Sequence, residues 1–215
     1  MRGFICKEQF KTHLHSGMSI MVGGFLANGS PEYLIDMILE TDFDNFTIIC
    51  NDGGFEDLGV GKLIVANRVK KLIASHIGTN PTAGKLMQEG KLEVTLVPQG
   101  TLVEQIRAAG AGLGGILTQT GLKTIVQDGK QVIEVKGVEY LLEEPIFADL
   151  AILGGAICDQ YGNLKYRQTM RNFNPIMATA ASLVIACCAS KVEEIDPEAV
   201  ITPFPLVDYI VMEVK

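Results

Sequence analysis

A short strand that runs through a glycine turn into a helix start occupies residues 19–32. Ser19–Val22 has the apolar character of a strand, and Gly23-Gly24 follows it directly. Ser30 is predicted to cap the next helix, with Pro31 in its first turn. Backbone amides at such a turn converge with the helix N-terminus, so the stretch predicts an anion-binding loop. A purely structural turn is the alternative, because glycine permits backbone angles that other residues avoid.

Strands and helices alternate along the first half of the chain. Strands are expected at 46–50, 71–75 and 93–97, with helical segments between them. This alternation predicts an open, mostly parallel α/β sheet flanked by helices. In such a sheet the carboxyl ends of the strands share one edge, where ligands bind. Small or polar residues stand at four of these ends: Gly23-Gly24, Asn51-Asp52, His76–Thr79 and Gln99–Thr101.

The second half is predicted to hold a small insertion and then to return to the sheet. Thr124–Gln127 and Lys130–Val135 flank Asp128-Gly129, which is a strong hairpin signal. Lys136-Gly137 and Val138–Leu142 extend this hairpin into a meander. We therefore expect a small β-hairpin insertion around 124–142, outside the main sheet. Later strands are expected at 148–154, 182–187 and 209–214. Because no internal repeat or linker is evident, residues 1–215 are interpreted as a single domain.

The composition narrows the class of partner. A formal net charge of −7 without a dense basic cluster argues against nucleic acid. No apolar run reaches the length of a membrane span, and charged residues interrupt any signal-peptide pattern. The five cysteines show no metal-ligand spacing, so reduced thiols and no metal are expected. These features predict a cytoplasmic protein.

One glycine run formally matches a dinucleotide fingerprint. Gly110, Gly112 and Gly115 fit G-x-G-x-x-G, and Glu134 lies where a ribose-binding acid could stand. The fingerprint requires a preceding strand and a following helix. Here the run follows a predicted helix, so a nicotinamide-dependent oxidoreductase is kept only as a lesser hypothesis.

Six strings along the chain together resemble the α subunit of the family I coenzyme A-transferases, of the acetate/butyrate–acetoacetate (3-oxoacid) type. The first is the Gly-Gly-Phe-x-x-x-Gly-x-Pro string that begins at Gly23. The others are Ser75–Pro81, Pro98–Leu102, Gly110–Gly115, Asn163–Tyr166 and Arg171–Pro175. The resemblance covers nearly the whole chain and implies the CoA-transferase/NagB-like form of the predicted sheet.

The resemblance implies an enzyme that moves CoA from an acyl-CoA to a free carboxylate through a glutamyl-CoA thioester. The family carries that glutamate on a β subunit, in a Ser-Glu-Asn-Gly type motif. The glutamates considered for this role, none of which has that context, are Glu56, Glu104, Glu143 and Glu144. Glu143-Glu144 is interpreted as a solvated pair. The expectation is therefore no catalytic residue on this chain, a β-subunit partner and a hetero-oligomer of α2β2 type or larger.

The implied substrates are a short-chain acyl-CoA or 3-oxoacyl-CoA and an acid such as acetate or acetoacetate. The resemblance implies coenzyme A as a substrate, and no permanently bound cofactor is expected. By resemblance, one loop would face CoA and help to form an oxyanion site: Gly23, Gly24, Phe25, Leu26, Ala27, Asn28 and Gly29. A second set of pocket candidates is His76, Gly78, Thr79, Asn80, Gln99 and Gly100.

Some of these residues have open alternatives. His76 is at least as well explained by a structural hydrogen bond, and Gln99 could contact a substrate carboxylate or the partner's glutamate. Two departures from the family pattern, Gln119 in place of proline and Phe204-Pro205 in place of a glycine turn, motivate a second hypothesis. In that hypothesis the chain is a non-catalytic CoA-binding or regulatory subunit. His13 and His15 are expected at the surface.

Overall fold

The computed structural model describes residues 2–213, with position 156 described by its backbone alone. The main-sheet strands are β1 (Gly3–Phe4), β2 (Ser19–Val22), β3 (Phe46–Cys50), β4 (Val69–Ala74), β5 (Glu93–Leu96), β9 (Ala148–Cys158), β10 (Leu164–Lys165), β11 (Ala181–Lys191) and β12 (Tyr209–Met212). The α-helices are α1 (Lys7–Lys11), α2 (Glu32–Leu39), α3 (Gly61–Val65), α4 (Pro81–Gln88), α5 (Gln99–Gly110) and α6 (Asn174–Met177). Short 3-10 helices are η1 (Ile125–Gln127), η2 (Gln168–Arg171), η3 (Pro197–Ala199) and η4 (Phe204–Leu206).

The main sheet has the strand order β1-β12-β11-β9-β2-β3-β4-β5, with β10 paired to β9. All pairings along that order are parallel, and β10 alone among these strands runs antiparallel to its neighbour. Parallel pairing follows from the helices that connect successive strands and cover both faces. The predicted open, mostly parallel α/β sheet is confirmed.

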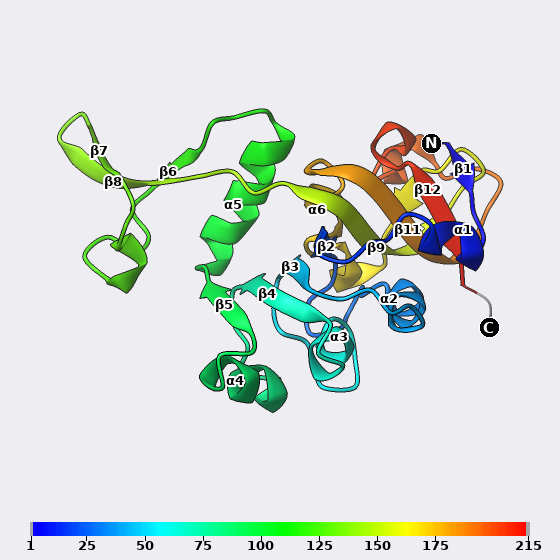
Figure 1. Cartoon of the computed structure of the whole chain (residues 1–215). Helices are drawn as coiled ribbons and strands as arrows, with labels where there is room; N and C mark the ends of the chain where they lie inside the picture. The colour runs from blue at the N-terminus through cyan, green and yellow to red at the C-terminus, as the bar shows by residue number, and fades with distance from the viewer. Residues whose placement is uncertain (1, 214–215) are drawn as a thin grey trace.

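Two apolar cores cover the two faces of the sheet. Successive strand residues point to opposite faces, so Ile20 and Val22 enter one core and Met21 enters the other. The first core is completed by α1, α2, α3 and α4, and the second by α5 and α6. Figure 1 shows α2, α3 and α4 on one side of the sheet and α5 on the other. The helices thereby fix the strand ends that carry the candidate site.

A separate three-stranded sheet stands away from the main sheet (Figure 1). It consists of β6 (Ile116–Thr118), β7 (Val132–Val135) and β8 (Val138–Glu143), all antiparallel, and we call it the arm. The insertion outside the main sheet and its turn at Lys136-Gly137 were predicted, but the expected hairpin at Asp128-Gly129 does not form. The turn is Lys136-Gly137, both with positive φ, whereas Thr124 caps η1 before Asp128-Gly129.

Some element boundaries differ from the expectations. The N-cap of α2 is Pro31, and the Ser30 hydroxyl makes no capping hydrogen bond. The last strand was expected to reach Val214, which lies outside the described residues. His15 is exposed as expected, but His13 is half-buried and stacks on Tyr209 with ring centroids 5.1 Å apart.

No helix within residues 2–213 has both the length and the apolarity needed to cross a membrane.

Candidate functional site

The carboxyl ends of β2, β3, β4 and β5 lie together at one edge of the sheet, because these strands are parallel neighbours. Hydrogen bonds join the loops that follow them. Asp52 and His76 form an isolated backbone bridge. The Gln99 Nε2 group donates to Asn51 Oδ1 at 2.9 Å. The predicted edge is thus a contiguous cluster of loops.

The first glycine loop, Gly23–Gly29, is a tight reverse turn. The backbones of Phe25 and Asn28 exchange hydrogen bonds of 3.1 and 2.9 Å. The residues between them, Leu26 and Ala27, have φ of 47° and 63°, as in a type I′ turn. The side chains of Phe25 and Leu26 are each 37% exposed. The loop therefore presents apolar groups at the sheet edge on a fixed backbone.

Most amides of this loop are already bonded within the chain, contrary to the expectation of converging free donors. The Gly23 amide donates to the Ile152 carbonyl at 3.0 Å, and the Gly24 amide donates to Asn172 Oδ1 at 3.2 Å. Within residues 2–213, the loop amides without an acceptor are those of Ala27 and Gly29. An oxyanion could receive backbone hydrogen bonds from these two positions.

The N-terminus of α2 is also occupied by groups of the chain itself. Glu32 Oε1 accepts a hydrogen bond from the Gly59 amide at 2.7 Å, and its Oε2 pairs with Lys62 Nζ at 2.9 Å. A carboxylate at this position is favoured by the helix dipole. The helix end therefore stabilises a contact between loops and does not present an open anion site.

The pattern of the first loop recurs at Gly53–Gly59, which also reads Gly-Gly-Phe-x-x-x-Gly. In each loop the phenylalanine and the residue three positions later form a backbone bridge. Asp52 joins the two loops, because its Oδ2 accepts from the Leu26 amide at 3.0 Å and its Oδ1 from the Gly54 amide at 2.9 Å. The prediction of no internal repeat is wrong on this local scale.

Two asparagines from the distant segment after β10 hold the first loop in place. Asn172 Nδ2 donates to the Asn28 carbonyl at 2.8 Å, while its Oδ1 accepts from Gly24. Asn174 is fully buried, and its Nδ2 donates to the Gly29 carbonyl at 3.0 Å. Both asparagines lie in the Arg171–Pro175 string. That string contributed to the family resemblance, but neither asparagine was predicted to have a role in the site.

A cavity of about 370 Å³ opens beside this loop. Apolar side chains and uncharged polar groups share its lining: Phe25, Asn51, Gln99, Val103, Thr169, Asn172 and Phe173. Its mixture of apolar walls and a few polar groups is typical of small-molecule sites. Of the residues predicted for the site, Phe25 and Gln99 line this cavity. Sequence reasoning missed Val103, Thr169, Asn172 and Phe173.

The remaining pocket candidates lie at the second loop. Thr79 Oγ1 donates to the Gly54 carbonyl at 2.8 Å, and Asn80 Nδ2 donates to the Gly53 carbonyl at 3.0 Å. Asn80 also caps α4 through its Oδ1. His76 is half-buried with its Nδ1 3.4 Å from Ser75 Oγ, Gly78 is exposed, and Gly100 lies in the first turn of α5. These contacts give Thr79 and Asn80 a supporting role for the loop.

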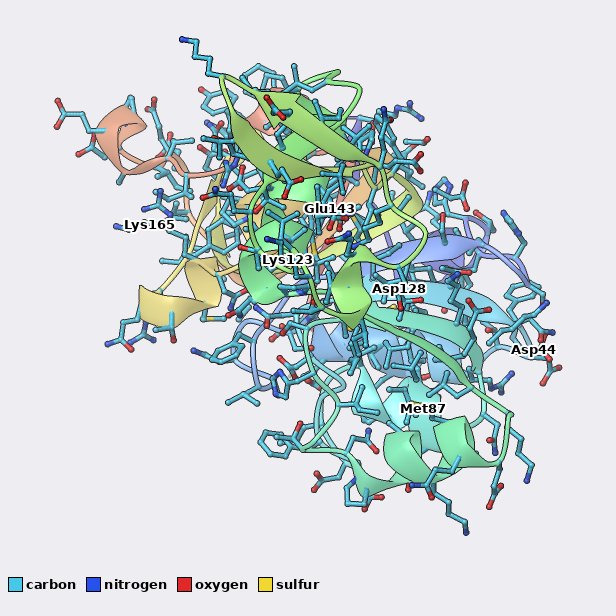
Figure 2. The ribbon with its side chains drawn as sticks, turned by 90° about the vertical axis from the view of Figure 1, so that its left-hand side faces the viewer. Asp44, Met87, Lys123, Asp128, Glu143 and Lys165 are labelled. Carbon is cyan, nitrogen blue, oxygen red and sulfur yellow. The ribbon has the colours of Figure 1, made fainter. Side chains whose placement is uncertain are left out.

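None of the four glutamates considered as a nucleophile lines the cavity beside the first loop. Glu56 accepts hydrogen bonds from Thr82, and Glu104 pairs with Arg107 at 3.0 Å. Glu143 is buried, which corrects the expectation of a solvated pair, whereas Glu144 is exposed. Lys130 Nζ at 2.6 Å and Gln105 Nε2 at 3.1 Å compensate the burial of Glu143. Glu143 ends β8 of the arm and is labelled in Figure 2.

The dinucleotide reading has no structural support. Gly110 ends α5, and the following glycines lead into strand β6 rather than into a helix. Glu134 lies in β7 of the arm, opposite Glu139. The order of elements is the reverse of what a dinucleotide-binding turn requires. Within residues 2–213, no cluster of three or more histidine, cysteine, aspartate or glutamate side chains could hold a metal ion.

Comparison with known proteins gives the same family along the whole chain. The family model for coenzyme A transferase matches residues 5–213. The acetoacetyl-CoA:acetate/butyrate CoA transferase alpha subunit of Clostridium acetobutylicum is 50% identical over 96% of this chain and 95% of its own length. The acetate CoA-transferase subunit alpha of Escherichia coli K12 is 49% identical over 91% of this chain and 90% of its own length.

Solved structures share the fold at lower identity. The acyl-CoA transferase YdiF of E. coli O157:H7, solved as a thioester complex with CoA, superposes with a TM-score of 0.86 at 23% identity over 98% of this chain. This chain spans 47% of the YdiF chain, or about half its length. Glutaconate coenzyme A-transferase of Acidaminococcus fermentans has a TM-score of 0.83 at 19% identity, over 99% of this chain and 75% of that one.

Proposed function

The chain belongs to the coenzyme A transferase family, and from this premise we propose that it is the α subunit of a heteromeric short-chain acyl or 3-oxoacid CoA-transferase. Enzymes of this family use CoA as a substrate. The proposed donors are short-chain acyl-CoA or 3-oxoacyl-CoA, and the proposed acceptors are acids such as acetate or acetoacetate. Near-complete coverage of two relatives named as alpha subunits supports a partner β subunit.

The composition of the cavity carries the proposal. Its lining offers amide and hydroxyl groups together with apolar walls, and no carboxylate is among the residues that line it. A reaction through a glutamyl-CoA thioester needs a carboxylate nucleophile at that position. We therefore assign the nucleophile to the partner subunit and the surrounding donors to this chain.

In this proposal, donors of this chain stabilise developing negative charge. Attack on a thioester moves charge onto the carbonyl oxygen, and preorganised N–H groups lower the energy of that state. The proposed groups are the Gln99 and Asn51 amides, which line the cavity, and the backbone amides of Ala27 and Gly29 in the adjoining loop, which have no acceptor within residues 2–213. No permanently bound cofactor is part of the proposal. A cytoplasmic location is proposed with it, and the five free cysteines fit that reducing compartment.

Reconstitution with a β-type chain tests the proposal. The two chains are co-expressed, and exchange of CoA between acetate and acetoacetyl-CoA or butyryl-CoA is measured. We expect exchange by the pair and none by this chain alone. A pair that forms but exchanges no CoA would overturn the proposal and favour the regulatory-subunit hypothesis.

Replacing Gln99 with leucine is expected to lower kcat about a hundredfold to a thousandfold in the reconstituted pair, the range for loss of one donor to an oxyanion. Gln99 is exposed, and within residues 2–213 its side-chain amide bonds to Asn51 alone, so the free energy of unfolding should change little. Steady-state kinetics and thermal unfolding measure the two effects. The matched control is Gln88→Leu at the exposed end of α4, which should leave kcat unchanged. Equal kcat for the two variants would remove Gln99 from the site.

A further inference from the structure

Three exposed basic side chains follow one another closely in the segment that leads from β10 through η2: Lys165, Arg167 and Arg171. Within residues 2–213, none of the three has an ion-pair partner or donates a side-chain hydrogen bond. The chain has 25 acidic and 18 basic residues, so acidic partners are plentiful elsewhere. A basic group of this kind on an acidic chain points to an anionic ligand.

The segment is joined to the first glycine loop by several contacts. The Asn28 side chain donates to Thr169 Oγ1, and Asn172 Nδ2 bonds to both the Asn28 and Thr169 carbonyls at 2.8 Å. A Cβ atom built on Gly29 would lie 2.8 Å from the Met170 carbonyl oxygen, so the two backbones are in close contact. Thr169 also lines the cavity beside the loop. The basic residues therefore flank, along the chain, a segment that lines the candidate site.

The buried Tyr166 orients the basic residues on either side of it. Tyr166 is buried and its hydroxyl lies 2.8 Å from Thr202 Oγ1. Alternation along the extended backbone places Lys165 and Arg167 on the same side, opposite Tyr166. Gln168 has a φ of 46°, a strained value for a residue with a side chain. Such strain is typical of functional segments. In Figure 2, Lys165 lies at the margin of the molecule, away from Lys123 and Glu143.

We propose that Lys165, Arg167 and Arg171 bind the phosphate groups at the nucleotide end of CoA. The inference rests on the proposed function, because the thioester end of CoA would then lie in the cavity beside Thr169 and Gln99. The pantetheine arm holds the phosphates away from the reacting sulfur, so their binding groups belong on the rim of the site. Arginine offers paired N–H donors that match a phosphate, and lysine adds a compact charge.

The test removes the three charges in the reconstituted pair with the variant K165Q/R167Q/R171Q. Acetoacetyl-CoA and acetoacetyl-pantetheine, which has no phosphate groups, serve as the two donors. We expect KM for acetoacetyl-CoA to rise about tenfold or more, since each exposed contact contributes modestly and three act together. We expect KM for acetoacetyl-pantetheine and kcat with both donors to stay unchanged. A purely structural effect of the substitutions would change both donors alike.

The control variant K70Q/K123Q/K136Q removes the same charge from three exposed lysines elsewhere that also have no ion pair in the described part of the chain. Its KM for acetoacetyl-CoA should equal that of the unmodified pair. An equal rise in the two triple variants would mean long-range attraction and would overturn the phosphate site. An unchanged KM for acetoacetyl-CoA in K165Q/R167Q/R171Q would also overturn it.

Direct binding separates this inference from the proposed function. Titration of the unmodified pair with CoA, 3′-phospho-ADP and inorganic phosphate needs no turnover. We expect 3′-phospho-ADP to compete with CoA, and to compete about tenfold less well in K165Q/R167Q/R171Q. Competition by inorganic phosphate as strong as that of 3′-phospho-ADP would indicate a general anion site and contradict the proposal. A pair that binds CoA in this way but exchanges none would contradict only the transferase proposal.

Discussion

Replacing Gly23 with alanine is expected to reduce CoA exchange by the reconstituted pair to background and to lower the free energy of unfolding by about 2–4 kcal/mol. A Cβ atom at this position would lie 1.8 Å from Asn174 Oδ1. Asn174 cannot move aside freely, because its side chain bonds to the Gly154 amide and to the Gly29 and Met170 carbonyls. Urea unfolding and the exchange assay measure the two losses.

A double-mutant cycle isolates the cause of that loss. If the contact with Asn174 is responsible, G23A/N174A should be only slightly less stable than N174A alone, because the clash is absent from both. Gly84→Ala is the matched control. Gly84 lies inside α4 with no heavy atom within 4 Å of a built Cβ, so alanine should raise helix stability by about 1 kcal/mol. Additive losses in the cycle would show that Asn174 is not the obstacle.

The position of the site edge could be predicted from local sequence. Each strand of the βαβ units ends in glycine or a polar residue, and parallel neighbours must bring those ends together. Gly23-Gly24, Asn51-Asp52 and Gln99 were identified on this basis, and they lie at one edge. Strand direction and connection length determine the position of this edge, so no long-range contact had to be known.

The hydrogen bonds by which Asn172 and Asn174 hold the first loop could not be predicted, because they join residues far apart in the sequence. Gly24 and Asn172 are separated by 148 positions in the sequence. The sequence around an asparagine in a turn does not indicate which distant group will form a hydrogen bond with its side chain. The amides of the loop were expected to be free, because local geometry does not reveal which carbonyls return to them. Ile152, Asp52 and Asn172 take those hydrogen bonds from other elements.

The arm shows a competition between two local signals. Asp128-Gly129 is the stronger hairpin signal by composition, but Thr124 Oγ1 accepts from the Val126 amide and donates to the Gly121 carbonyl. These hydrogen bonds stabilise η1, so the residues before Asp128 form a 3-10 helix and not a strand. Lys136-Gly137 then makes the turn with φ of 53° and 77°. The pairing of Val132–Val135 with Val138–Glu143 brings Val135 opposite Val138, which leaves Lys136-Gly137 as the two turn residues.

Replacing Asp159 with alanine is expected to lower the free energy of unfolding by about 3–5 kcal/mol. Asp159 is fully buried where β9 turns toward β10. Its Oδ1 accepts from the amides of Tyr161, Gly162 and Asn163 at 2.9–3.0 Å. Its Oδ2 accepts from Asn163 Nδ2 at 2.8 Å and from the Ile195 amide at 3.3 Å. Alanine would leave these donors without an acceptor in a closed turn, which urea unfolding would register.

The same carboxylate predicts a pH dependence with a definite sign. Burial raises the pKa of Asp159, but the Asn163 side chain and the surrounding amides lower it by more, so the net shift is downward. A lowered pKa in the folded state gives stability that is complete above the unfolded pKa of about 3.9 and is lost as pH falls through the folded pKa. The stability difference between the unmodified chain and D159N should therefore be constant from neutral pH to about pH 5 and shrink below about pH 4. The control D128N replaces an exposed aspartate whose carboxylate accepts no hydrogen bond within residues 2–213, so it should cost little stability at neutral pH. A difference for D159N that stays constant to about pH 3 would show that ionisation of Asp159 does not stabilise this turn.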